Sequence, residues 1–290
     1  MSTIPLKYKD RREEGDTVLR QCQLVQLHLL HVVDAICKQH KLTYVLDGGS
    51  LLGAMRHNGF IPWDDDLDIG MPRKDYNRFL EIARRELPKD VIMLTPEDTP
   101  ERVIGFTKLK DAYSFYAELS LGVSIKRNSG IFIDIFPYDT ISGLPNDLEH
   151  PFVMFAKKMY HYARALQNSG SRGWLFALFG GWLSLIPYTI HYTIRLCFWL
   201  LGFVTKRRMN YYCWQFPFRT SYPISALLPV KEHVFEDGVF PIPNDADFVL
   251  TRMFGDWRKL PPEAERHGGH GKLILPFQAV MVPGAMKWEE

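Results

Sequence analysis

Cysteine is scarce in this sequence of 290 residues. The four cysteines, Cys22, Cys37, Cys197 and Cys213, lie far apart, and they form no C-x-x-C pair or other paired metal spacing. This spacing argues against a disulfide scaffold and against a zinc ribbon. Reduced thiols of a cytoplasmic protein are the simpler interpretation.

The sequence also lacks an excess of charge of one sign. Lys and Arg number 35 against 33 Asp and Glu, so the net charge of +2 gives no bulk electrostatic reason to expect a nucleic-acid binder. The polar N-terminus, MSTIPLKYKDRREEGD, has no apolar h-region, so we expect no signal peptide. A hydrophobic content of 46% excludes a disordered chain and suffices for a substantial core.

Helix and strand patterns are mixed along the first half of the chain, which predicts an α/β (α+β) fold. Apolar residues spaced alternately by four and three predict a helix over residues 17–39, with Asp16 as its N-cap. Further helices are predicted over 50–56 and 74–86. Short apolar runs predict strands at 44–47, 68–71, 91–94, 103–109 and 131–136.

An acidic cluster is the most informative feature, with four carboxylates at Asp64, Asp65, Asp66 and Asp68. If Asp66 and Asp68 lie on a strand, their two-residue spacing directs both side chains to one face. A hard divalent cation such as Mg²⁺ relieves the repulsion between such carboxylates and binds substrate phosphates as well. An acidic surface turn is the alternative, but apolar residues on both sides of the cluster favour a metal site.

Two further segments point to phosphate chemistry. Gly48, Gly49 and Ser50 lie between a predicted strand and a predicted helix, where backbone N–H groups can hold a phosphate; a plain strand-to-helix turn is the common alternative. Asp134 interrupts the apolar strand GIFIDIFP. A lone carboxylate there is costly unless it is paired or bound to metal, so Asp134 is a candidate third ligand, with a paired structural aspartate as the alternative.

The string from Gly48 to Phe79, GGSLLGAMRHNGFIPWDDDLDIGMPRKDYNRF, resembles the LicD family, which includes the fukutin-related proteins. The resemblance continues in IDIFP at 133–137 and in FGDWRKLPP at 254–262, and it spans about residues 20–270. It implies a nucleotidyltransferase-like mixed sheet core flanked by helices. The sequence departs from the better-known members across 151–215.

The resemblance implies metal-dependent transfer of phosphocholine, or of a related alcohol phosphate such as ribitol phosphate, from a CDP-activated donor. The acceptor is a sugar hydroxyl of a cell-surface glycan, as in lipopolysaccharide or teichoic acid, or of its lipid-linked precursor. Mg²⁺ or Mn²⁺ is the implied cofactor, and no nucleic acid takes part. Two alternatives stay open: an NMP-transferring nucleotidyltransferase that acts on a small molecule, and a non-catalytic membrane-associated scaffold.

The same resemblance assigns roles to residues. Asp66, Asp68 and Asp134 are the implied metal ligands and catalytic residues, and either Asp134 or Asp64, through a water, accepts the proton of the acceptor hydroxyl. The candidates for binding the donor and its phosphates are Gly48, Gly49, Ser50, Arg56, Arg73 and Lys108. Each of these three cations has a structural or solvated ion pair as its alternative. The aromatic residues Trp63, Tyr76 and Phe136 are candidates for stacking on cytosine or lining a choline pocket, although core packing is the commoner role.

The composition changes after residue 150, and we divide the chain into a core at 1–150, a helical apolar insertion at 151–215 and a C-terminal segment at 216–290 that packs back on the core. Between residues 174 and 204, 22 of 31 residues are apolar. Gly180, Gly181 and Pro187 interrupt this stretch, so two short helices in the membrane interface fit better than one span; buried core helices and a true span are the alternatives. We therefore expect a cytoplasmic protein with a peripheral contact at the inner face of the membrane.

Overall fold

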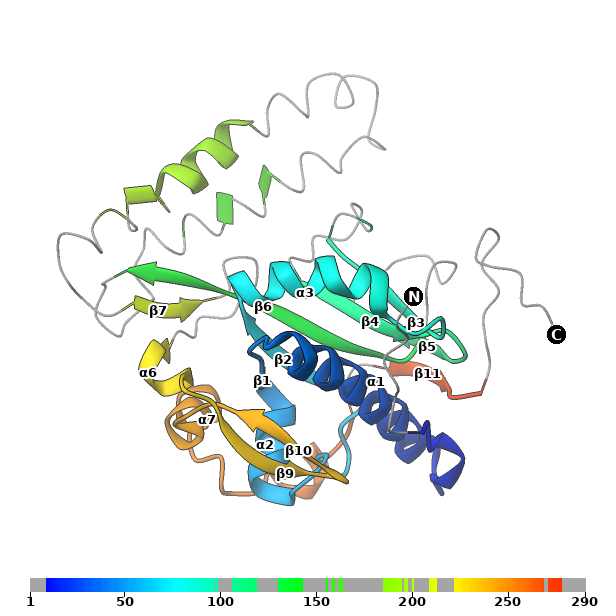
Figure 1. The fold of residues 1–290 in the computed structure, drawn as a ribbon. Coiled ribbons are helices and arrows are strands. Elements are labelled where there is room, and N and C mark those ends of the chain that lie inside the picture. The colour runs from blue at the N-terminus through cyan, green and yellow to red at the C-terminus, as the bar shows by residue number, and fades with distance from the viewer. Residues whose placement is uncertain are drawn as a thin grey trace.

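The structure is a computed structural model, shown in Figure 1. It describes residues 9–96, 98, 106–118, 130–142, 209–212, 222–268 and 271–277, with scattered positions between 155 and 200. The helices are η1 (Arg12–Glu14), α1 (Val18–His40), α2 (Gly48–His57), α3 (Arg73–Glu86), α6 (Ile224–Leu227), α7 (Ala246–Phe254) and η3 (Glu263–Glu265). The strands are β1 (Val45–Leu46), β2 (Asp68–Pro72), β3 (Val91–Leu94), β4 (Thr107–Asp111), β5 (Phe115–Glu118), β6 (Phe132–Ser142), β7 (Met209–Tyr212), β8 (Tyr222–Pro223), β9 (Lys231–Phe235), β10 (Gly238–Ile242) and β11 (Gly271–Leu275).

A mixed sheet forms the centre of the fold, with the strand order β1-β2-β6-β4-β3. Only β2 and β6 are parallel; the other neighbours on this path are antiparallel. The far end of the long strand β6 pairs with β7, which pairs in turn with β8. This arrangement, flanked by helices, confirms the α/β fold expected from the sequence.

Helices α1 and α3 lie side by side and both contact β6 (Figure 1). Ile133 and Ile135 of β6 belong to the same buried core as Val33 of α1 and Phe79 of α3. Because side chains alternate along a strand, Asp134 points to the opposite face of the sheet. The two helices thus bury one face and leave the other for polar chemistry.

The β9–β10 hairpin, α7 and α2 gather beside β1 (Figure 1). Phe235 of β9, Phe240 of β10 and Leu250 of α7 are buried in the same core as Leu46 of β1. The polypeptide after residue 222 is therefore part of the packing that surrounds α2.

Two helix starts differ from the sequence prediction. Thr17, rather than Asp16, is the N-cap of α1, because its side chain accepts the N–H of Arg20. Helix α2 begins at Gly48 instead of Ser50, since Asp47 caps it by accepting the Gly48 N–H at 2.9 Å. In the predicted strand 103–109, residues 103–105 lie outside the described residues, and β4 begins at Thr107.

Most of the apolar stretch at 174–204 lies outside the described residues, including Gly180, Gly181 and Arg195. Residues 185–194 are helical on both sides of Pro187, so the break expected at this proline is not found among the described residues. Among the described parts of the chain, no helix combines the length and apolarity needed to cross a membrane.

Candidate active site

Asp68 and Asp134 face each other across the centre of the sheet. They are direct partners in the parallel register of β2 and β6, whose backbones are about 4.8 Å apart in such a pair. The backbone also ties this point together, because the Asp134 N–H donates to Leu67 O at 2.9 Å and the Asp47 N–H donates to Asp68 O at 3.0 Å. Parallel pairing thus brings the two carboxylates predicted from separate motifs to one place.

Asp66 does not lie on a strand, which corrects the geometry that we assumed for the Asp66–Asp68 pair. Strand β2 begins at Asp68, and Asp66 belongs to the preceding loop. Asp66 nevertheless lies close enough to Asp68 for its charge to help raise the pKa of Asp68. A folded loop, and not the two-residue alternation of a strand, brings the two side chains together.

The carboxylates of this cluster lie close enough together to raise one another's pKa values. Burial and the charges of Asp66, Asp134, Asp47 and Asp64 raise the pKa of Asp68 well above its usual range. Burial and the adjacent Asp66 raise the pKa of Asp64 to about 8. Accumulated negative charge is the dominant electrostatic feature of this site.

The first turn of α2 lies directly against the acidic cluster. A methyl group at Gly48 would lie 2.9 Å from Asp68 Oδ2, and one at Gly49 would lie 2.7 Å from Asp64 Oδ2. Gly48 also has φ of +52°, a conformation that favours glycine. The two glycines therefore let the positive end of the helix approach both carboxylates.

Ser50 joins the helix to the strand. Its hydroxyl oxygen accepts the N–H of Asp68 at 2.8 Å, and its side chain is buried. This bond fixes the position of Asp68 relative to the first turn of α2. The binding of a donor phosphate by the Ser50 hydroxyl stays a prediction.

Lys108 and Asp134 form a buried ion pair. Lys108 Nζ lies 2.9 Å from Asp134 Oδ1 and 3.1 Å from Oδ2, and it stands over the ring of Phe132. Lys108 therefore lies beside the acidic cluster, in an ion pair of the kind that was the alternative to donor binding, and its contact with the donor stays a prediction. Lys110, which the sequence analysis did not select, is buried two residues further along the same strand and also stands over Phe132.

A divalent cation fits the chemistry of this donor set. Within the described ranges, no group of three or more His, Cys, Asp or Glu side chains has the arrangement of a formed metal site. The half-buried and mutually repelling carboxylates of Asp64, Asp66 and Asp68 are, however, hard oxygen ligands, which Mg²⁺ and Mn²⁺ prefer. Asp134 has the Lys108 ammonium beside it.

Arg73 is separated from the acidic cluster. It follows the last residue of β2, whereas Asp68 is the first, and five residues of parallel strand span about 16 Å. Its guanidinium forms a two-bond ion pair with the buried Asp139, at 2.8 and 2.9 Å. The structure thus shows Arg73 in the structural ion pair that was the alternative to donor binding.

Arg56 lies at the other end of α2 in a second polar group. Its Nε donates to His57 Nε2 at 3.0 Å, and the His57 ring makes an edge contact with Trp63. The guanidinium of Arg266 stands over the Trp63 ring, 5.7 Å from its centroid. Burial and the charge of Arg266 lower the pKa of Arg56, so this group concentrates positive charge beside the acidic loop.

The three candidate aromatic residues have different surroundings. Tyr76 is buried, and its hydroxyl meets Thr107 Oγ1 at 2.6 Å, so it has a packing role. Phe136 packs against the core and against Phe106. Trp63 lies between His57 and Arg266 and is the one that adjoins the acidic loop.

Asp47 is a site residue that sequence reasoning did not select. Its carboxylate caps α2, accepts a hydrogen bond from the Tyr138 hydroxyl and contributes to the raised pKa of Asp68. Its position directly before the Gly-Gly-Ser turn, at the end of an apolar strand, was the signal that could have identified it. Arg266 had no comparable local signal.

Comparisons with known proteins identify the relatives of this chain. The sequence model of the LicD/FKTN/FKRP nucleotidyltransferase domain matches residues 41–172. The chain is 32% identical over 267 residues to the lipopolysaccharide cholinephosphotransferase LicD of Haemophilus influenzae, which covers 87% of this chain and 96% of that protein.

Shorter matches reach the ribitol 5-phosphate transferase FKRP. The mouse protein is 30% identical over 101 residues, covering 35% of this chain and 18% of its own length. The human protein is 59% identical over 43 residues, covering 15% of this chain and 9% of its own length. With similarity along nearly the whole of the bacterial relative, this chain belongs to the LicD family.

Proposed function

We propose that this protein transfers a phosphorylated alcohol, with phosphocholine as the first candidate, from a CDP-activated donor to a sugar hydroxyl. The acceptor is a cell-surface glycan, such as lipopolysaccharide, or its lipid-linked precursor. The relatives support the coarser part of this proposal, since one is a lipopolysaccharide cholinephosphotransferase and another a ribitol 5-phosphate transferase. The CDP donor and the metal are our own inference.

The convergence of Asp64, Asp66, Asp68 and Asp134 beside the first turn of α2 is the observation that carries the proposal. Transfer of a phosphoryl group depends mainly on positioning and on stabilising the charge that spreads over its oxygens. A cluster of hard anionic ligands next to helix N–H groups supplies both. An ordinary structural site would gain nothing from this much repulsion.

Asp66 and Asp68, with Asp134, are the residues that would hold Mg²⁺ or Mn²⁺. When bound, such an ion neutralises the diphosphate and stabilises the leaving group. The N–H groups of Gly49 and Ser50 belong to the first turn of α2, which has no intrahelical acceptors, and they are placed to donate to phosphate oxygens.

Other side chains bind and orient the donor. Lys108 supplies a cation beside Asp134, and Arg56 supplies one at the far end of α2. Trp63 offers its ring for stacking on the cytosine base. With the donor held in this way, the acceptor hydroxyl would attack the phosphorus atom that carries the alcohol, a new P–O bond would form, and CMP would leave.

Removal of the acceptor proton falls to Asp64 or Asp134. In the metal-free protein, burial and the charge of Asp66 raise the pKa of Asp64 to about 8, so Asp64 takes up a proton more readily than an ordinary carboxylate does, as a general base must. Asp134, which pairs with Asp68 in the sheet and lies beside Lys108, is the alternative base.

Product analysis tests the proposal. We expect the purified protein to release CMP from labelled CDP-choline or CDP-ribitol when Mg²⁺ and a glycan acceptor are present. Release of pyrophosphate from ATP or CTP would instead indicate an NMP transferase. Absence of both products would favour a non-catalytic scaffold.

A matched pair of variants ties the activity to the acidic cluster. Asp68→Asn should abolish CMP release and remove the rise in melting temperature caused by Mg²⁺. Asp34→Asn is the control, because Asp34 is also a buried carboxylate but lies in α1, where it accepts a hydrogen bond from Tyr44. Equal activity in the two variants would contradict the assignment.

A further inference from the structure

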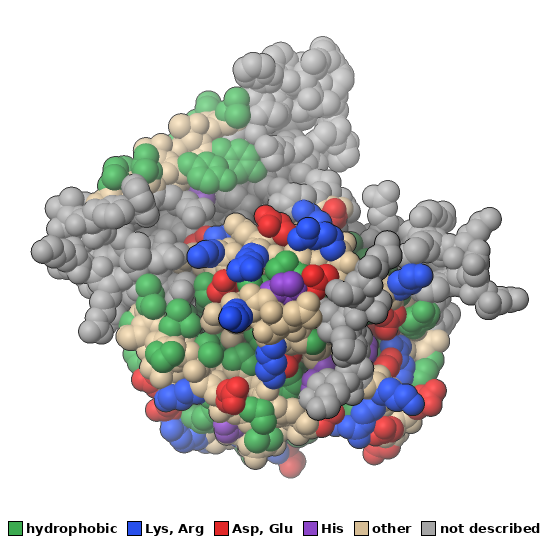
Figure 2. Space-filling view, viewed as in Figure 1, with side chains coloured by type: hydrophobic (Ala, Val, Ile, Leu, Met, Phe, Trp, Pro, Cys, Tyr) green, Lys and Arg blue, Asp and Glu red, His purple; other side chains and the backbone are tan. Residues whose placement is uncertain are grey.

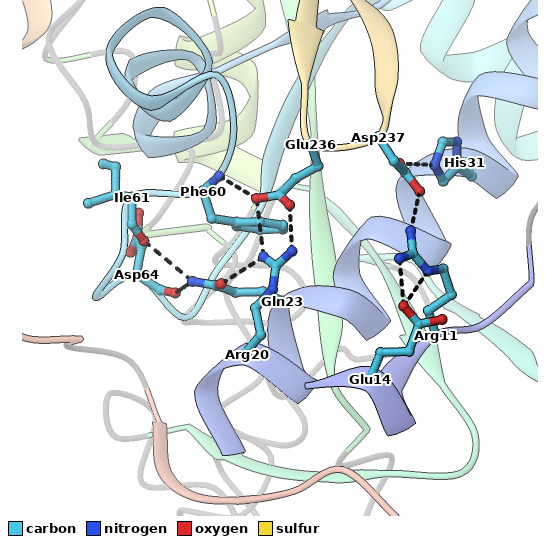
Figure 3. Close-up of polar contacts among 10 residues, drawn as sticks. All are labelled: Arg11, Glu14, Arg20, Gln23, His31, Phe60, Ile61, Asp64, Glu236 and Asp237. Carbon is cyan, nitrogen blue, oxygen red and sulfur yellow. Dashed lines mark hydrogen bonds and ion pairs between the residues drawn. The ribbon is translucent and has the colours of Figure 1, made fainter. Parts of the chain in front are cut away.

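The turn of the β9–β10 hairpin lies against α1 (Figure 3). Its two residues, Glu236 and Asp237, point in different directions: Glu236 toward the loop that precedes the acidic cluster, and Asp237 toward α1 and η1. Glu236 has φ of +55°, so the turn holds a backbone conformation that is uncommon for a residue other than glycine.

Glu236 is bonded to the start of the acidic loop through both its side chain and its backbone. Its carboxylate accepts the N–H of Phe60 at 3.0 Å, and its own N–H donates to Asn58 O at 2.8 Å. A methyl group at Gly59 would lie 2.5 Å from Glu236 Oε1, so a larger residue at this position would displace the carboxylate from its present place.

Helix α1 continues the same network to the acidic residues. Arg20 donates two hydrogen bonds to Glu236, at 2.6 and 3.1 Å, and one to Gln23 at 3.2 Å. Gln23 Nε2 donates in turn to Asp64 O at 2.9 Å and to Ile61 O at 3.3 Å. Figure 3 shows this path from the hairpin turn to the loop.

We propose that Glu236 is a positioning residue for the active site, which holds the backbone of residues 60–64 so that Asp64 and Asp66 face Asp68. This inference rests on the proposed function for its catalytic consequence. Carboxylates that repel one another move apart unless the backbone that carries them is held. A loop fixed at Phe60, Ile61 and Asp64 resists that movement.

Asp237 provides a matched control within the same turn. It lies 2.8 Å from His31 Nε2 and 3.2 Å from Arg11 Nη1. These two contacts tie the hairpin to α1 and to the residue before η1, and they do not involve the acidic loop. Loss of Asp237 therefore weakens the docking of the hairpin while it leaves the bond to Phe60 in place.

The experiment compares Glu236→Ala with Asp237→Ala in the full chain. We expect Glu236→Ala to accelerate hydrogen exchange in residues 58–66, to weaken Mn²⁺ binding measured by electron paramagnetic resonance, and to lower kcat about tenfold to a hundredfold. Asp237→Ala should change hydrogen exchange, Mn²⁺ affinity and kcat by no more than about twofold. Its melting temperature should nevertheless fall about as much as that of Glu236→Ala.

Two further variants guard against a simple folding defect. Glu236→Gln keeps an acceptor for the Phe60 N–H and should restore much of the exchange protection and of kcat. Gln23→Met removes the bonds to Ile61 and Asp64 at nearly constant volume and should lower Mn²⁺ affinity, as Glu236→Ala does. If Glu236→Ala fails to fold, the results for Glu236→Gln and Gln23→Met test the proposal instead.

Identical exchange and Mn²⁺ affinity in Glu236→Ala and Asp237→Ala would overturn the proposal and leave Glu236 with a purely structural role. Unchanged hydrogen exchange and Mn²⁺ affinity in Gln23→Met would also overturn the proposal. If the unmodified protein releases no CMP, the proposed function fails, while hydrogen exchange and Mn²⁺ binding still decide whether Glu236 holds the acidic loop.

Discussion

Negative charge on Asp64 and Asp68 is disfavoured in the metal-free protein, because burial and neighbouring carboxylates both raise the pKa values of these residues. Partial compensation comes from the positive end of α2, against which both side chains lie. Further compensation requires either protons or a cation. The acid–base behaviour of the metal-free protein should therefore report directly on this cluster.

Stability of the metal-free protein should fall as pH rises from about 4 to about 8. The folded pKa of Asp64, about 8, lies above the unfolded value, so the folded state binds more protons across this window and loses that advantage with rising pH. Thermal unfolding in EDTA at several pH values measures the slope. The slope should be smaller in Asp64→Asn, and the stabilisation by Mg²⁺ should grow with pH; a flat profile in the unmodified protein would contradict this cause.

Gly48→Ala should inactivate the enzyme with only a modest loss of stability. The residue has φ of +52°, so alanine costs about 1 kcal/mol in backbone strain, and its methyl group also meets Asp68 Oδ2 at 2.9 Å. Gly255→Ala is the control, because Gly255 has φ of +67° with no atom within 4 Å of an added methyl group. Gly48→Ala and Gly255→Ala should have similar free energies of unfolding, and only Gly48→Ala should lose CMP release. This result would support the contact with Asp68.

At the scale of elements, helix ends position the site more than helix centres do. The last turn of α2 carries Arg56 and His57, while its first turn meets the acidic cluster. The start of α3 is an exception, because Arg73 pairs with Asp139 of β6 at the end of β2 away from the acidic cluster. Helix α1 contributes Arg20 and Gln23, which lie within two turns of its start and hold the acidic loop.

The start of α1 gives a prediction that separates the observed cap from the expected one. Thr17→Ala should lower the free energy of unfolding by about 1 kcal/mol, because the hydroxyl that accepts the Arg20 N–H is lost. Asp16→Ala should change it by less than about 0.5 kcal/mol. Urea unfolding of both variants measures the difference, and a larger loss in Asp16→Ala would mean that the cap has been assigned to the wrong residue.

At the scale of the whole molecule, the helix at 185–194 stands away from the mixed sheet, beyond β7 (Figure 1). Figure 2 shows hydrophobic side chains gathered on this part of the surface. Leu185, Ile186 and Tyr192 are each more than half exposed. We propose that this helix lies in the interface of the cytoplasmic face of the membrane, where a lipid-linked acceptor would be within reach.

Fractionation and liposome binding test this arrangement. We expect part of the protein to be recovered with membranes and to be released by high salt or carbonate. Replacing Ile186 and Tyr192 by serine should abolish binding to anionic liposomes and leave CMP release on a soluble acceptor unchanged. Full recovery in the soluble fraction without liposome binding would favour a packing role for this helix, and resistance to carbonate would indicate a true span.

Much of the fold and part of the site follow from local sequence. Periodicity predicted α1, α3 and β3 closely, because amphipathic spacing and short apolar runs are local properties. The small strand pairs β9–β10 and β5–β11 were not predicted, since their alternation is weak and their stability comes from packing on distant elements.

The sequence by itself determined the family, the mixed α/β class and the acidic and glycine motifs, since each is a property of contiguous residues. Tertiary structure alone decided which side chains meet. Parallel pairing of β2 with β6 places Asp134 opposite Asp68, the length of β2 removes Arg73 from them, and a distant hairpin brings Glu236 to Phe60. Such contacts depend on strand register and on burial shared between segments far apart in the chain, which no local pattern encodes.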